Sequence, residues 1–282
     1  MRRQPPADDS ILCEKCGYIL DNLPVELNCP ECGKPVRESA EGLDRRPPIV
    51  EREGASIRTR VLTMFDVVAH PYSCFRTFAI ASHPYQRRFK WHMMILSSLL
   101  FGLSGGLHAR WILWFFGWDY GTYPRSFEVF ALLVFSMVLF VSAVVFIVTL
   151  VTEQLVAYFT AIEGRFWGYR LRKDVVRRVL SYHIAHLVPI SFITLVIVSL
   201  NLLNSLNQTV RGIKPIYYLY ALCAWVLVAA FWLMSTYVSA MRAVMFANRP
   251  MPPEMKPESK PTLQPNQSAR DSASIHPANQ AS

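Results

Sequence analysis

Four cysteines near the N-terminus have the residue type and the spacing of a metal site. They form two Cys-x-x-Cys-Gly units, with Cys13 and Cys16 in the first and Cys29 and Cys32 in the second. Four thiolates spaced in this way can surround one zinc ion as a closed tetrahedron, which leaves no coordination position open for chemistry. A redox-active cysteine pair is the alternative, and the presence of a second matched pair argues against it.

The residues around the cysteines predict how the metal module folds. Gly17 and Gly33 each follow a cysteine pair and can adopt the positive φ that turns backbone amides toward the sulfurs. Two short strands joined by a turn are predicted at 18–20 and 25–27. We therefore expect residues 11–36 to form a small β-hairpin zinc ribbon with one structural Zn²⁺. So small a module cannot fold on buried area alone, so the metal must supply much of its stability.

The rest of the sequence is apolar enough to lie mainly in a membrane. Apolar residues make up 52% of the chain and charged residues 17%, against roughly 25% charged residues in a typical soluble protein. Four runs reach the roughly 20 residues that a helix needs to cross hydrocarbon, and they cover about 91–111, 129–151, 184–206 and 216–241. We therefore predict an all-α polytopic membrane protein whose transmembrane helical domain covers residues 88–248.

Other patterns lie outside the predicted spans. Residues 1–10 are polar and contain no apolar h-region, so we expect a disordered start and no signal peptide. Residues 249–282 are rich in proline, serine and asparagine and are predicted to be disordered. Residues 37–60 are charged and contain two consecutive prolines, which indicates a flexible linker. At 61–82 the apolar spacing predicts an amphipathic helix on the membrane surface, broken near Pro71.

Lysine and arginine are unequally distributed between the two sides of the predicted spans. Because such residues accumulate on the cytoplasmic side, we expect an inner-membrane protein with both termini in the cytoplasm. A reducing compartment would also keep the four thiols available for zinc. The side with more positive charge carries Arg87, Arg88, Lys90, Arg165, Arg170, Arg172, Lys173, Arg177, Arg178, Arg242 and Arg249, whereas the other carries Arg110, Arg125, Arg211 and Lys214.

The net charge of +9 does not predict that the metal module binds nucleic acid. Residues 10–36 contain two lysines against one aspartate and three glutamates, and a zinc tetrathiolate adds further negative charge. The positive excess lies beside the spans, where it is explained by topology and by contact with membrane lipids. A protein partner is therefore expected for the module.

A second candidate site consists of histidines at the cytoplasmic ends of spans. His92, His183 and His186 lie there, with Glu153 at the end of the second span. Because His183 and His186 are three residues apart, they could present one face to a metal or haem. Ordinary packing at the membrane interface is the other interpretation of these histidines.

The sequence contains no common catalytic motif. Gly-x-Ser-x-Gly, His-Glu-x-x-His and a phosphate-binding glycine loop are all missing. Gly102, Gly105 and Gly106 predict close packing between helices rather than a pore. Polar side chains inside the predicted spans are few, with His186 and Asn201 among them, together with Asn204.

Several hydrophobic motifs resemble the bacterial branch of the Yip (Ypt-interacting protein) membrane family. The resemblance covers about 61–247 and rests on the segments 69–76, 179–189 and 239–244. Members of this family typically have five spans, so the resemblance implies a fifth span from the Trp111–Trp118 region or from Glu153–Trp167. Eukaryotic relatives bind small GTPases, and no residue of this sequence carries that role across. The N-terminal module separately resembles a double-knuckle zinc ribbon.

Together these patterns predict a non-enzymatic membrane protein, an adaptor or organiser whose cytoplasmic ribbon docks a protein partner. A transporter or channel component for a small solute or ion, acting as an oligomer, is the first alternative. A haem- or metal-dependent membrane enzyme is the second. A homo-oligomer is compatible with each of the three.

Overall fold

The computed structural model describes residues 10–40, 45–78, 83–115, 127–169, 171, 173–207 and 215–248. All of these residues belong to one compact unit, Met1–Pro250. The predicted disordered tail at 249–282, and all but the last residue of the predicted disordered start at 1–10, lie outside the described residues.

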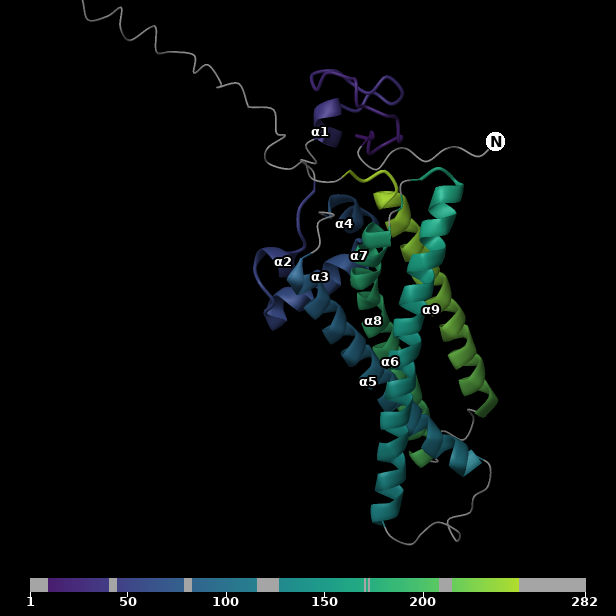
Figure 1. The fold of residues 1–282 in the computed structure, drawn as a ribbon. Coiled ribbons are helices and arrows are strands. Elements are labelled where there is room, and N and C mark those ends of the chain that lie inside the picture. The colour runs from purple at the N-terminus through teal and green to yellow at the C-terminus, as the bar shows by residue number, and fades with distance from the viewer. Residues whose placement is uncertain are drawn as a thin grey trace, which may run out of the picture. The chain divides into compact units, whose positions relative to one another are not determined.

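Long helices make up most of the described chain and confirm the prediction of a multi-pass membrane protein (Figure 1). Among the described residues, four segments are long and apolar enough to cross a membrane. The helices concerned are α5 (Pro84–Phe115), α6 (Phe127–Phe166), α8 (Leu187–Asn207) and α9 (Pro215–Val244). Neither proposed source forms a fifth span in the described chain, because Glu153 to Phe166 continues α6 and Trp111 to Phe115 continues α5.

The glycines of α5 lie at its contact with α6, in agreement with the predicted close packing between helices. Helix α5 packs against both α6 and α8. A β-carbon on Gly102 would lie 2.6 Å from the carbonyl oxygen of Val138 on α6, and one on Gly106 would lie 2.6 Å from Cγ2 of the same valine. Because real β-carbons do not approach other atoms so closely, glycine is what allows α5 and α6 to meet, as expected for membrane helices.

Replacing Gly102 with leucine is expected to lower the free energy of unfolding by ~1–3 kcal/mol, the usual cost of overpacking. The added side chain has no space, because the backbone of α6 lies in its way. Far-UV circular dichroism during chemical unfolding in micelles would measure the loss. Leu103→Val, at the half-exposed neighbouring position, is the control; equal stability of the two variants would contradict close packing at Gly102.

Shorter helices gather around one end of the long ones. They are α1 (Val36–Ala40), α2 (Ile49–Arg52), α3 (Ile57–Ala69), α4 (Pro71–Thr77), α7 (Lys173–His183) and the 3₁₀ helix η1 (Ile184–His186). Helix α3 ends at Ala69 and α4 begins at Pro71, so the helix is interrupted at the position that the proline predicts. Helix α7 and η1 lead directly into α8.

Part of the predicted linker, residues 37–60, is packed against other helices: α2 contacts both α3 and α5. Val50 of α2 is fully buried, and its backbone N–H donates a hydrogen bond to Thr63 Oγ1 at 3.0 Å. Ser56 caps α3, because its hydroxyl accepts a hydrogen bond from the Thr59 N–H. Residues 49–60 are therefore part of the packed helical structure and not a linker between separate units.

The metal module differs from the predicted β-hairpin. Within the part of the chain that the structure describes there is no named strand, and the module contains only two isolated antiparallel bridges. One joins Leu12 to Ile19 and the other joins Asn28 to Pro35. Each bridge closes the chain around its own cysteine pair, so the segments predicted as partner strands do not pair with each other.

Candidate metal centre

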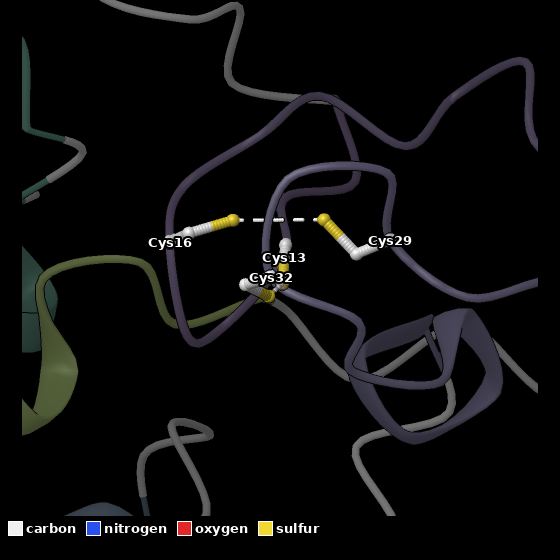
Figure 2. A group of neighbouring side chains, drawn as sticks. All are labelled: Cys13, Cys16, Cys29 and Cys32. Atoms are coloured by element: carbon white, nitrogen blue, oxygen red, sulfur yellow. Dashed lines mark hydrogen bonds between the residues drawn. The ribbon is translucent and has the colours of Figure 1, made fainter.

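The structure brings the four predicted cysteines together. Their sulfur atoms all lie within 4.8 Å of one another, and Figure 2 shows the four side chains converging from two loops. The Sγ atoms of Cys13 and Cys32 are 3.4 Å apart, and those of Cys16 and Cys29 are 3.6 Å apart. These distances are too long for disulfide bonds. All four cysteines are free thiols.

Short-range hydrogen bonds fold each cysteine pair into a knuckle. The Gly17 N–H donates to the Cys13 carbonyl at 2.8 Å, and the Gly33 N–H donates to the Cys29 carbonyl at 2.9 Å. Both glycines have positive φ, 78° and 72°, which confirms the backbone conformation predicted for them. A further hydrogen bond closes each turn from outside. The Cys13 N–H donates to the Tyr18 carbonyl and the Cys29 N–H donates to the Lys34 carbonyl, both at 2.8 Å. The local sequence therefore holds the sulfurs in place.

The arrangement fits a tetrahedral metal ion. Four sulfurs at about 2.3 Å from a central zinc lie about 3.8 Å from one another, and the observed separations fall around this value. Burial, followed by the neighbouring thiols, raises the pKa of the Cys16 thiol to about 12. Crowded, partly buried thiolates need a cation beside them, and a divalent metal is the usual one.

One side of the module is bound to the residues that follow α9. The Asn248 side chain donates hydrogen bonds to the carbonyls of Leu12 at 2.7 Å and Ser39 at 2.8 Å. It also accepts one from the Leu12 N–H at 2.9 Å. The ring of Phe246 lies so close to Gly17 that a β-carbon there would approach it within 2.5 Å. The module is therefore fixed to its own chain on this side.

Glu14 of the module forms two ion pairs, one of which leads to a second part of the chain. The Arg45 Nε donates to Glu14 Oε1 at 2.7 Å, and another guanidinium nitrogen of Arg45 donates to the Phe78 carbonyl at 3.0 Å. Lys34 lies 3.9 Å from the other carboxylate oxygen of Glu14. Since Glu14 stands between Cys13 and Cys16, the metal loop is tied through Arg45 to the end of α4.

Replacing Asn248 with alanine is expected to speed hydrogen–deuterium exchange at the Leu12 amide by about fivefold, since one net hydrogen bond is worth ~1 kcal/mol. The metal content should stay unchanged, because Asn248 is not a ligand. Asn22→Ala, at an exposed position of the module, is the control. Unchanged exchange at Leu12 in the Asn248 variant would show that this contact does not hold the module in solution.

A buried ion pair near the ends of the spans was not predicted from the sequence. Arg178 of α7 donates to Glu51 of α2 at 2.8 Å and to Gln86 of α5 at 2.8 Å. The Tyr182 hydroxyl donates to the second oxygen of Glu51. The Arg178 and Glu51 side chains are only 5% and 2% exposed. In the sequence Arg178 indicates only membrane topology, because the fold is what brings these residues together from distant positions.

A second buried ion pair joins α5 to α6. Lys90 Nζ lies 2.7 Å and 2.5 Å from the two carboxylate oxygens of Glu153, whose side chain is 4% exposed. Trp91, next to Lys90, stacks on Phe146 of α6. Glu153 therefore has a lysine partner rather than a place in a histidine cluster.

The three predicted histidines do not come together. The rings of His183 and His186 lie 4.6 Å apart between centroids. His92 is exposed on α5, and its Nδ1 lies 2.5 Å from the carbonyl oxygen of Arg88. Among the described residues, the cysteine cluster is the only group of three or more potential ligands close enough to hold a metal ion. The structure therefore concentrates metal-binding chemistry at the cysteines.

His186 and Asn201, two of the polar residues predicted inside the spans, lie far apart. His186 Nε2 and Asn201 Nδ2 are buried without a hydrogen-bond partner among the described residues. Fifteen positions along the chain separate these two residues, which corresponds to roughly 20 Å of helix, so they do not form a joint polar site. The side chain of Asn204 lies outside the described residues.

Comparison with known proteins adds no relative to this picture. No protein-family model, no curated protein and no solved structure matches the chain.

Proposed function

We propose that this chain is a non-enzymatic protein of the cytoplasmic (inner) membrane, in which one structural zinc ion shapes a module that docks a cytoplasmic protein. The observation that carries this proposal is the exposed apolar surface of the module. Tyr18, Ile19 and Leu27 each expose 40–51% of their surface. Asn248 and Phe246 contact the module at Leu12, Ser39 and Gly17, and with these contacts made the three side chains keep that exposure.

The donor set supports a structural ion. Four cysteine sulfurs complete a tetrahedral coordination shell, which leaves no position for a substrate or a water molecule. Zinc is the divalent ion that such a thiolate site most often holds in a reducing compartment. The ion would then act by fixing the shape of the two knuckles.

The charges of the module support a protein partner rather than a nucleic acid. Its exposed acidic residues are Asp21, Glu26 and Glu31, against Lys15 as the exposed lysine. Phosphate backbones require positive charge on the protein, and this surface supplies the opposite sign. The expected partner carries an apolar contact surface bordered by lysine or arginine.

The number of candidate spans supports the orientation. An even number of spans, such as these four candidates, would leave both termini on the same side of the membrane, and the distribution of lysine and arginine favours the cytoplasm. Reporter fusions at the two termini are expected to give cytoplasmic signals for both. Opposite signals would mean an odd number of spans and would remove this topology.

Crosslinking in intact cells, followed by purification of the full chain, tests the docking function. A partner captured by the native protein should be lost in Ile19→Asp, which leaves the cysteines unchanged and should still bind about one zinc per chain. The same partner should be lost in Cys29→Ser and retained in Arg52→Asp, a control at an exposed position of α2. Retention of the partner in the first two variants would contradict docking by the module.

A further inference from the structure

Helix α6 is much longer than a membrane is thick. Its 40 residues correspond to about 60 Å at ~1.5 Å per residue, whereas the hydrocarbon core measures about 30 Å. A substantial part of α6 must therefore lie outside the hydrocarbon, and the side chains of this part decide what surrounds it.

The ion pair between Lys90 and Glu153 indicates where the cytoplasmic boundary lies. Charged side chains are costly within hydrocarbon and collect at its edge, and Trp91 next to Lys90 suits the same depth. Arg87 and Arg88, less than one turn earlier on α5, are exposed. The remainder of α6, from Gln154 to Phe166, then extends roughly 20 Å past this boundary, well beyond a headgroup layer of about 5–8 Å.

One face of this projecting segment is used within the chain. Ala157 is fully buried, and Thr160 hydrogen-bonds the hydroxyl of Tyr237 on α9. Gly164 approaches Leu171 so closely that a β-carbon would lie 2.7 Å from the leucine β-carbon. These positions recur at intervals of three and four residues, so they mark the inner face of the helix.

The opposite face is apolar and uncovered. Leu155, Phe159 and Ile162 expose 48–62% of their surface, and they also recur at intervals of four and three. Val148 and the exposed Thr152 extend the same stripe toward the membrane. Positions 148, 155 and 162 are seven residues apart, as are 152 and 159, which is the spacing of a two-helix seam.

We propose that this stripe of α6, from Val148 to Ile162, is the contact between two copies of the chain. The inference does not depend on the proposed function of the metal module. Two copies in one membrane have the same orientation, so a two-fold axis along the membrane normal places their α6 helices parallel. A parallel pair with apolar side chains at every third and fourth position is the arrangement that a seven-residue repeat supports.

A second copy fits this stripe better than lipid does. Phe159 and Ile162 lie roughly 9 and 14 Å past the ion pair along the helix, beyond the headgroup layer, where acyl chains do not reach. A seven-residue repeat is self-complementary when the same face of an identical helix meets it, because each side chain then packs between those of the partner. The stripe is also continuous with the membrane-embedded part of α6, so one helix pair can run through both regions.

Photocrosslinking in intact membranes tests this contact. Two differently tagged copies of the full chain would carry p-benzoylphenylalanine at Ile162, or at Val238 as the control. Val238 is exposed on α9 and follows Tyr237, which contacts Thr160, so its depth is similar. We expect an adduct of twice the mass of the chain, carrying both tags, from position 162 and none from position 238.

Two substitutions give an independent readout. Ile162→Asp would place two negative charges against each other across the seam, and should reduce co-purification of the two tags at least tenfold. Val238→Asp should leave it unchanged. Adducts from position 162 that contain only lipid or another protein would overturn the proposal. Failure to form any adduct there, or equal co-purification of the two aspartate variants, would overturn it as well.

Discussion

Replacing Cys29 with serine is expected to reduce the bound metal from about one ion per chain to nearly none and to unfold the module. Metal binding supplies roughly 10–16 kcal/mol of apparent free energy to small zinc modules at neutral pH. Hydrophobic burial cannot replace it here, because the buried apolar cluster of the module consists of Leu20 and Val36 together with the cysteines Cys13 and Cys29. Elemental analysis and hydrogen exchange over residues 11–40 would measure both effects.

Cys223→Ser is the matched control for that variant. Cys223 is a free, exposed cysteine on α9, so its loss should change neither the metal content nor the exchange of the module. The long helices should also insert normally in the Cys29 variant, because no cysteine ligand lies in them. Full metal content after loss of Cys29 would show that the sulfurs brought together here are not the ligands.

Replacing Arg178 with methionine is expected to lower the free energy of unfolding by about 3–5 kcal/mol. Among the described residues, the variant would leave the buried Glu51 carboxylate with the Tyr182 hydroxyl as its remaining side-chain partner. Methionine fills a volume close to that of the arginine stem, so the loss would come mainly from the uncompensated charge. Chemical unfolding in micelles, followed by far-UV circular dichroism, measures it.

Two further variants show whether the charge is the cause. Arg177→Met removes the adjacent arginine, whose hydrogen bond to Gln154 is exposed, and should cost less than about 1 kcal/mol. Adding Glu51→Gln to Arg178→Met should restore part of the lost stability, since it removes the unpaired charge. Equal losses for Arg177→Met and Arg178→Met would contradict a stabilising role for the buried pair.

Local chemistry made the metal site predictable from the sequence. Cys13, Cys16, Cys29 and Cys32 were identified by spacing alone, because each knuckle forms within five residues and its glycine fixes the turn. The predicted β-hairpin is not seen in the described residues, since apolar runs such as 18–20 and 25–27 do not specify their pairing partners. Here each knuckle is closed by its own flanking residues.

The spans were also predictable, because whether a helix can cross the hydrocarbon depends on the length and composition of one continuous segment. Contacts between distant segments were not predictable. The pairing of Glu51 with Arg178 and the binding of Asn248 to Leu12 join residues separated by 127 and 236 positions. A polar residue such as Asn248 gives no sign in the sequence of what it will meet. The predicted span 129–151 does not show that its helix, α6, continues to Phe166.

We propose that four sulfurs close a structural zinc site on this membrane protein. X-ray absorption spectroscopy at the zinc edge, on the purified full chain, is the sharpest test of this site. We expect about one zinc per chain with four sulfur neighbours at about 2.3 Å and no lighter ligand. A coordination shell that includes oxygen or nitrogen, a site filled with iron, or a protein that binds no metal would contradict it.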